Sequence, residues 1–301
     1  MWVLHERFDR AARTHPVVRA KAAFRDALRR AGARVAELPA HWALVGDARA
    51  ALSALPRLPR PEAALLNGAL HTPDEYAELD DACRAKNLLL LNAPAHYAVA
   101  RSLERAWPAL EGLTPATRFA SSPEALFEAV KELGLPVFLK GAVQALKHRG
   151  WSHCVARSDA QVARIAEGLW GDHERSDGVV AVRRLVSLRH ARTADDGFPL
   201  GREYRVFALD GEPLALGAYW PGHDVLTALR ADEEAAVRDL ARTAARRLGV
   251  PYLAVDVGQL DDGSWTVIEC GDPQFCGFCQ VDVGRLAGAL LGAVRSREVG
   301  T

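Results

Sequence analysis

The sequence predicts an α/β protein with more than one lobe. Three features of its 301 residues support this class. The first third alternates helix and strand signals, and the rhythm restarts after a segment with several glycines and prolines at residues 111–123. The final third carries two predicted β-hairpins separated by a helix. A chain of this length can bury two or three packed layers.

The first third is typical of a small α/β unit with a mostly parallel sheet. Apolar residues at helical spacing predict a helix over residues 17–30, and short strand signals cover residues 34–38, 63–66 and 88–91. Thr72, Pro73 and Glu75 make the pattern of a capping box with proline at the first helical position, which predicts a helix over residues 73–86. We expect residues 1–112 to form an N-terminal domain.

The remaining residues, 113–301, are expected to form a second domain. Its smaller lobe, 113–181, has predicted strands at 117–120, 136–140, 152–156 and 179–185, and helices at 122–134 and 159–169. Its larger lobe, 182–301, has hairpins over 204–218 and 252–270 that turn at Asp210-Gly211 and Asp261-Asp262-Gly263. Helices are predicted at 232–248 and 283–294.

Composition narrows the possible partners. Acidic and basic residues number 38 each, so net charge does not attract a polyanion and we expect no nucleic-acid partner. No apolar run is long enough to span a bilayer, and residues 1–10 lack the pattern of a signal peptide. The five cysteines are an odd number scattered along the chain, which is typical of reduced thiols. We therefore expect a cytoplasmic protein without a membrane partner, and the choice between monomer and homodimer stays open.

The last hairpin carries the strongest chemical signal. Asp256 lies on one strand and Glu269 on the next, each among β-branched residues, and Asp272 follows closely. Burying a carboxylate is costly unless a cation pairs with it. Oxygen ligands of this kind suit Mg²⁺, which keeps several waters and takes other ligands from phosphates. The alternative is structural, with one acid capping a turn and another pairing with an arginine.

A second signal is Lys140, which ends an apolar strand and precedes a loop with Gly141 and Gly150. A lysine in this place can meet a phosphate as a point charge, and Lys147 adds another cation to the same loop. The alternative is an ordinary edge lysine before a solvated loop.

A third signal is the pattern Glu-x-Arg-x-Phe. Glu203, Arg205 and Phe207 lie on one face of a strand because side chains alternate with a period of two. The arginine can stabilise charge on a transferring phosphoryl group, or it can form a structural ion pair with an acid.

Three cysteines raise a minor alternative. Cys276 and Cys279 have the spacing of zinc ligands, with Cys270 as a single further thiol. Structural zinc sites usually need two such pairs, so inert or substrate-lining thiols are the preferred interpretation.

In this order, the strand lysine, the Glu-x-Arg strand and the hairpin acids resemble the ATP-grasp superfamily. The resemblance covers residues 113–284, and the stretch before it looks like the small α/β domain that precedes the nucleotide-binding lobes in such proteins. It implies an ATP-grasp fold with ATP and Mg²⁺ as cofactors. The implied Mg²⁺ ligands are Asp256, Glu269 and Asp272.

The resemblance also implies roles for the other residues. Arg205 would meet the γ-phosphate or an acyl phosphate, and Lys147 would close over the phosphates. Backbone groups of a hinge strand would hold the adenine edge. The implied nucleotide contacts are Lys140, Lys147, Val182, Arg183, Arg184, Leu185 and Glu203. Many relatives carry a glutamate at the hinge, where this chain has Arg183 and Arg184.

The implied activity is an ATP-dependent ligase. It would activate a small-molecule or peptide carboxylate as an acyl phosphate, with ATP converted to ADP, and join it to an amine or another nucleophile. Two alternatives remain at this point: a kinase-like phosphotransferase and a non-catalytic nucleotide-binding protein.

Overall fold

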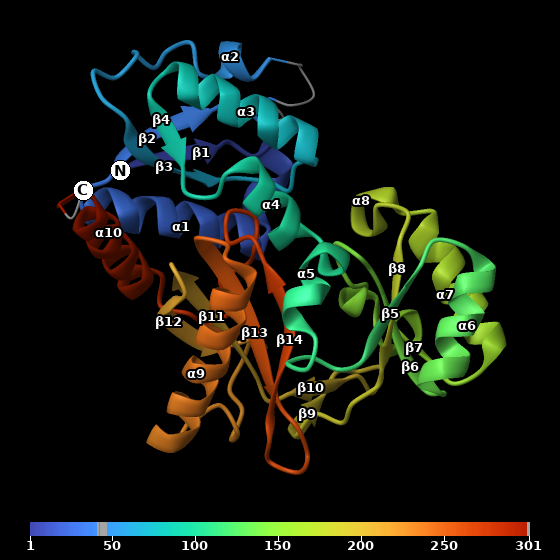
Figure 1. Cartoon of the computed structure of the whole chain (residues 1–301). Helices are drawn as coiled ribbons and strands as arrows, with labels where there is room; N and C mark the ends of the chain where they lie inside the picture. Colours follow the sequence, from blue (N-terminus) through green and yellow to red (C-terminus); the bar gives the residue numbers. More distant parts are fainter. Residues whose placement is uncertain (41, 43–46, 300–301) are drawn as a thin grey trace.

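The computed structural model describes residues 1–40, 42 and 47–299 of the chain. Figure 1 shows an N-terminal domain, a small lobe and a large lobe. This mixed architecture confirms the predicted fold class. Among the described residues, no helix combines the length and apolar character needed to cross a bilayer.

The N-terminal domain is built on a parallel sheet in the order β2-β1-β3-β4. Its strands are β1 (Trp2–Glu6), β2 (Arg34–Leu38), β3 (Glu62–Asn67) and β4 (Leu88–Leu90). Its helices are η1 (Arg10–Thr14), α1 (Pro16–Arg30), α2 (Ala48–Ala51) and α3 (Pro73–Ala85). The predicted capping box is present, because Thr72 accepts from the Glu75 amide and Glu75 accepts from the Thr72 amide. The sequence analysis did not predict β1.

Two helices absent from the sequence prediction lead out of this domain. They are α4 (Pro94–Arg101) and α5 (Leu103–Leu110). Leu103, Ala106 and Leu110 of α5 belong to the hydrophobic core that lies under the large sheet. These helices therefore anchor the connection between the domains against the large lobe.

The small lobe is an antiparallel sheet in the order β5-β8-β6-β7. Its strands are β5 (Thr117–Ala120), β6 (Val137–Gly141), β7 (Val155–Ala156) and β8 (Val180–Arg184). Its helices are α6 (Pro123–Leu133), η2 (Lys147–Arg149), η3 (Trp151–His153), α7 (Asp159–Trp170) and α8 (His173–Ser176). Because β8 pairs with β5 and β6 up to Arg184, the boundary expected at 181/182 falls within this strand. We propose that the lobe boundary follows Arg184.

The large lobe is an antiparallel sheet in the order β12-β11-β13-β14. Its strands are β11 (Glu203–Leu209), β12 (Glu212–Ala218), β13 (Tyr252–Gln259) and β14 (Trp265–Gly271). A separate hairpin joins β9 (His190–Thr193) to β10 (Pro199–Gly201), and the helices are α9 (Ala231–Leu248) and α10 (Val283–Val299). Val206 packs in one core with Val237 of α9, whereas Phe207 packs in another with Leu290 of α10.

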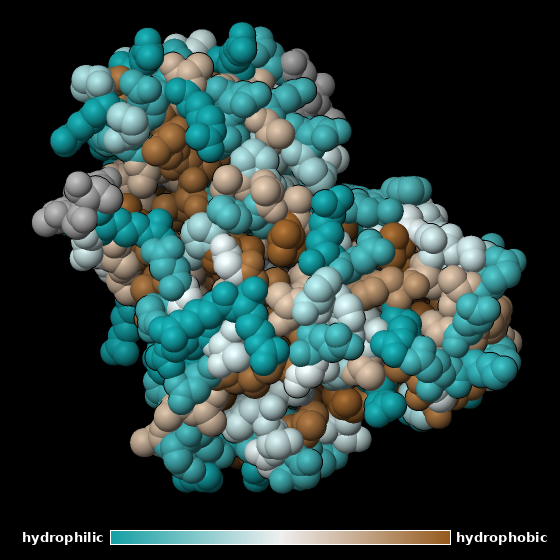
Figure 2. Space-filling model, viewed as in Figure 1, coloured by the Kyte–Doolittle hydropathy of each residue, from teal (hydrophilic) through white to brown (hydrophobic). Residues whose placement is uncertain are grey.

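The second of these cores is shared between domains. Phe24 and Leu28 of α1 pack in the same cluster as Phe207 and Leu290. Apolar area is thus removed from water where the N-terminal domain meets the large lobe, which favours their association. Figure 2 shows hydrophobic residues gathered near this junction on an otherwise largely hydrophilic face.

Candidate functional site

A row of charged side chains crosses the large sheet. Arg205 lies opposite Asp256 in the β11–β13 pair, and Asp256 lies opposite Glu269 in the β13–β14 pair. Side chains that face each other across strands have Cβ atoms about 5 Å apart, so this register brings the three together. Arg205 donates from Nε and Nη2 to the two carboxylate oxygens of Asp256, both at 2.7 Å. The pattern of alternating residues therefore placed both hairpin acids and the arginine on one face.

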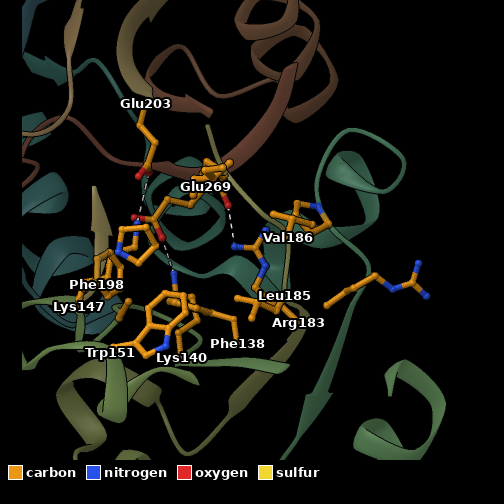
Figure 3. A pocket seen from close by; sticks show the side chains of 16 residues that line it. Phe138, Lys140, Lys147, Trp151, Arg183, Leu185, Val186, Phe198, Glu203 and Glu269 are labelled. Atoms are coloured by element: carbon orange, nitrogen blue, oxygen red, sulfur yellow. Dashed lines mark hydrogen bonds and ion pairs between the residues drawn. The ribbon is translucent and has the colours of Figure 1, made fainter. Parts of the chain in front are cut away.

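The small lobe presents Lys140 to this row. Lys140 lies at the end of β6, only 2% exposed, and its Nζ donates to Oε2 of Glu269 at 2.7 Å (Figure 3). Gly141 follows because the chain has no room for a side chain there: a Cβ would come within 2.1 Å of the Arg175 carbonyl oxygen. The Lys140–Glu269 pair thus joins the two lobes at the base of the site.

Lys147 forms a second bridge from the small lobe. It begins η2, and its Nζ lies 3.6 Å from Oε2 of Glu203 (Figure 3). The same ammonium lies over the rings of Tyr219 and Trp220, at 5.1 and 5.7 Å from their centroids. Trp220 donates from Nε1 to Oε1 of Glu203, while Oε2 is buried without a hydrogen bond. Glu203 therefore retains an oxygen that can accept a further ligand.

The electrostatics of these residues are strongly coupled. Burial raises the pKa of Glu203, with Lys147 acting in the opposite direction. Burial would also raise the pKa of Glu269, but attraction to Lys140 and Lys147 outweighs it and the pKa of Glu269 falls below its usual range. Burial opposes the charge on Lys147, yet the surrounding acids, Glu203 first, raise the pKa of its ammonium. Glu269 and Lys147 are therefore charged at neutral pH.

A pocket between the lobes adjoins these charges. It encloses about 670 Å³ of empty space, counted out to open solvent, within the range of small-molecule sites. Beside Lys140, Lys147, Glu203 and Glu269 its walls are largely apolar and aromatic. The other lining residues include Phe138, Trp151, Leu185, Val186, Leu188, Phe198 and Ile268. An apolar slot with cations and carboxylates at one end fits a purine base with attached phosphates.

The hinge prediction holds for only part of its segment. The side chain of Val182 is fully buried in the small-lobe core, and its backbone lies between paired strands β5 and β6. Val182 therefore does not fit the expected adenine contact. Leu185 and Val186 line the pocket, and no hydrogen bond joins their backbones to other described residues. The free backbone edge begins where β8 ends.

The two hinge arginines also differ from the expectation. Arg183 lines the pocket, but its guanidinium is buried and donates to the carbonyl of Ile268 at 2.8 Å and to the hydroxyls of Thr114 and Thr117. Burial lowers the pKa of Arg183 to about 10, so it stays charged at neutral pH. This side chain ties β8 to the large sheet. Arg184 lines the pocket with its side chain, while its amide donates to Ala116.

Asp272 lies apart from the other two acids. It is fully buried, its Oδ1 accepts from the amide of Gln274, and its Oδ2 accepts from Asn92 and from the Gln274 side chain. Neither of the two site cavities is lined by it. The side chain points toward the N-terminal domain because β14 ends at Gly271, before Asp272. Asp272 therefore does not fit the expected role of third Mg²⁺ ligand.

A second, larger cleft opens on the other side of the acids. It encloses about 1640 Å³ of empty space, counted out to open solvent, and shares Lys147 and Glu269 with the first pocket. Arg205 and Asp256 line this cleft. Its further walls come from α1, α4, the small lobe and the segment Cys270–Gly277. The added lining residues include His15, Val17, Val18, Ala100, Arg101, Arg175, Tyr219, Phe275 and Cys276. We call it the acceptor cleft.

The fit to a metal depends on an exchange of partners. Within the described part of the chain, no three acidic, histidine or cysteine side chains are already arranged to hold a metal. The reason is visible in the site, since Asp256, Glu269 and Glu203 each face a cation of the protein. Three buried carboxylates, one with a free oxygen, are nevertheless the donor set that Mg²⁺ prefers. The residues present fit Mg²⁺ bound together with a phosphate chain that takes over the cations.

Several contributors to the site were not assigned from the sequence. Trp151 and Trp220 were considered without a role, while Tyr219 and Phe198 were not considered. Their rings form a chain of contacts, with Trp151 and Phe198 centroids 5.1 Å apart and Tyr219 and Trp220 centroids 5.0 Å apart. Isolated aromatic residues give no positional signal in a sequence, because only the folded chain shows which lysine they surround.

Comparisons with known proteins agree with this geometry. Residues 118–290 match the model of an ATP-grasp domain family, the third family of its clade. No curated protein sequence matches the chain. Among solved structures, a D-alanine–D-alanine ligase from Bacillus anthracis, complexed with ATP, is similar, with a TM-score of 0.66 and 13% identity over 100% of this chain and 98% of that chain.

Two further structures show the same likeness. D-alanyl-alanine synthetase A from Vibrio cholerae O1 biovar eltor str. N16961 has a TM-score of 0.64 and 15% identity, over 100% of this chain and 99% of that chain. A RimK domain ATP-grasp protein from Sphaerobacter thermophilus DSM 20745 has a TM-score of 0.58 and 18% identity, over 98% of this chain and 100% of that chain. At these identities the likeness establishes the fold.

Proposed function

The chain belongs to the ATP-grasp superfamily, and from this premise we propose that it is an ATP-dependent ligase that joins a carboxylate to an amine. The observation that carries the proposal is the meeting of Lys140 and Lys147 with the acids Asp256, Glu269 and Glu203 between two cavities. One cavity suits a nucleotide and the other an acceptor. The carboxylate substrate is a small molecule or a peptide.

The nucleotide would enter the apolar pocket. Its adenine lies between the side chains of Phe138 and Ile268, and its edge meets the free backbone of Leu185 and Val186. The phosphates extend toward Lys140 and Lys147, whose ammonium groups act as point charges. These contacts fix the γ-phosphoryl group at the border with the acceptor cleft, where both cavities share Lys147 and Glu269.

Asp256 and Glu269 would hold Mg²⁺, with Glu203 close to both. When bound, Mg²⁺ neutralises charge on the phosphates and on the groups that exchange the phosphoryl group. To release the acids, Lys140 turns from Glu269 to the phosphates and Arg205 turns part of its guanidinium from Asp256 toward the acceptor cleft. Each cation thus keeps an anionic partner throughout.

The reaction then proceeds in two transfers. A carboxylate oxygen of the substrate forms a bond to the γ-phosphorus while the bond from that phosphorus to the β–γ bridging oxygen breaks, which releases ADP. An amine nitrogen then bonds to the acyl carbon of the acyl phosphate, phosphate leaves with its C–O bonding pair, and the amine loses a proton. Arg205 stabilises the developing charge, and the segment 142–150 shields the acyl phosphate from water.

A screen for ADP release tests this proposal. Purified protein with Mg·ATP is offered amino acids and short peptides singly and in pairs, and products are identified by mass spectrometry. A ligase releases ADP and phosphate and forms an amide only when both substrates are present. A phosphorylated product from a single substrate would instead support a kinase-like reaction.

Matched variants complete the test. Lys140→Ala should abolish turnover, whereas Lys131→Ala, an exposed lysine on α6 of the same lobe, should leave turnover unchanged. No binding of any adenine nucleotide by the folded protein would sink the proposal.

A further inference from the structure

The N-terminal domain has a cleft of its own beside α1. It encloses about 870 Å³ of empty space, counted out to open solvent. It lies where β1 and β2 of the parallel sheet end, which Figure 1 shows next to α1. Ligands of open parallel sheets commonly bind at this carboxyl edge. The lining residues are His5, Arg7, Phe8, Val18, Arg19, Ala22, Arg25 and Glu37.

The charge of this cleft is mostly positive. Arg7 and Arg19 are exposed, and no carboxylate among the described residues lies within ion-pair distance of either side chain. Arg25 is held by Asp26 at 2.9 Å and by Glu37 at 3.4 Å. Glu37 is thus the one acid in the described lining, against three arginines. An anion that entered would meet two guanidinium groups with unused donors.

His5 adds a buried polar atom to the floor. The residue is 4% exposed, and its Nδ1 interacts with Asn67, at 3.1 Å from the side-chain amide and 3.2 Å from the carbonyl. Nε2 of His5 has no hydrogen bond to any described residue. When Nδ1 accepts from the amide of Asn67, Nε2 carries the proton and can donate to an anion in the cleft.

The cleft is continuous with the acceptor cleft. Val18 lines both, with His15 and Val17 on the acceptor side and Arg19 on the other. From Val18 to Arg25 the lining follows one face of α1, a length of about 10 Å at 1.5 Å per residue. An extended peptide covers this distance with about three residues. A ligand that reaches past Val18 therefore has room for several residues.

We propose that this cleft is a distal subsite for carboxylate groups of an extended acceptor, an acidic peptide whose reacting end lies in the acceptor cleft. The inference rests on the proposed ligase function for the reacting end. Arg7, Arg19 and His5 recognise the carboxylates, and Phe8, Val18 and Ala22 contact the apolar parts of the chain. The subsite makes the enzyme select acceptors by charge several residues away from the bond that forms.

Binding of a fluorescently labelled penta-glutamate peptide, measured by anisotropy at low salt, tests the subsite. We expect Arg7→Gln and Arg19→Gln each to weaken binding about fivefold, the size of a modest exposed ion pair. Arg30→Gln, an exposed arginine at the end of α1 outside the cleft, is the matched control and should bind like the wild type. A penta-glutamine peptide should bind far more weakly than penta-glutamate, and added salt should weaken the glutamate peptide.

Two results would overturn the inference: equal binding of both peptides, or unchanged glutamate binding in the Arg7 and Arg19 variants. Both variants replace exposed side chains, and their unfolding temperatures verify that they fold. Peptide binding is measured without nucleotide, so it decides about the cleft even if Mg·ATP does not bind. Failure of Mg·ATP to raise the unfolding temperature would count against the ligase proposal separately.

Discussion

The substitution Glu269→Gln tests the centre of the site because two functions meet in one carboxylate. In the unliganded protein Glu269 is the partner of buried Lys140 at 2.7 Å. With nucleotide it would become a ligand of Mg²⁺. Glutamine is nearly the same size and can still accept a hydrogen bond, so the substitution removes the negative charge and little else.

The two effects have different sizes. A hydrogen bond to a charged group contributes about 1.5–3 kcal/mol, and glutamine retains part of it, so we expect the unliganded variant to lose about 1–2 kcal/mol. At 2–4 °C per kcal/mol, the unfolding temperature should fall by about 5 °C. Wild-type protein at 100 times its Kd gains about 2.7 kcal/mol from Mg·ATP, whereas a variant that binds about 100-fold more weakly gains only about 0.4 kcal/mol.

Thermal unfolding with and without Mg·ATP measures both effects, and ADP release with a true substrate measures the third. Glu212→Gln is the matched control, because Glu212 is an exposed acid on β12 of the same sheet, paired with Arg242 and Arg246. The control should keep the full Mg·ATP shift. If Glu269→Gln also keeps the full shift and turns over ATP normally, Glu269 is not a metal ligand and the reasoning fails.

Three further substitutions separate the roles of nearby groups. Arg205→Lys keeps the charge but loses the two-pronged contact with Asp256, so we expect destabilisation of about 1–3 kcal/mol by chemical denaturation and at least a tenfold loss of kcat; a fully active variant would contradict this role. Asp272→Asn should leave the Mg²⁺ concentration needed for half-maximal turnover within about twofold of wild type, and a tenfold increase would return Asp272 to the metal ligands. Burial lowers the pKa of Lys21 to about 8, below its unfolded value, so the folded protein gives up this proton first as pH rises and stability recovers by about 3 kcal/mol between pH 8 and 10.5. Lys21→Met should lack this recovery in denaturant titrations across that range, and an identical pH profile would refute it.

The sequence predicted those site residues whose positions follow from local pattern. Strand periodicity placed Arg205 with Phe207, and the hairpin turn set Asp256 against Glu269, because alternation and turn position fix a register. Lys140 followed from its place at the end of an apolar strand. These features need no knowledge of distant contacts.

The misplaced residues depend on where strands stop and what they meet. Asp272 is three positions from Glu269, but β14 ends between them and the chain turns toward Asn92, which lies 180 positions earlier. Val182 was expected at a free hinge, yet β8 continues to Arg184 and pairs on both sides. Strand ends of this kind are set by tertiary pairing, which a single sequence does not encode locally.

The ion pairs of the resting site imply a rule for how its cargo enters. Lys140, Arg205 and Lys147 each face an acid, so the unliganded centre is electrically balanced. A bare divalent ion would draw the acids away and strand three cations in a buried space, and a naked triphosphate would strand the acids instead. We therefore expect the metal and the nucleotide to arrive as one chelate, with neither admitted well alone. A protein built this way would stay indifferent to the free magnesium around it and respond to the supply of ATP.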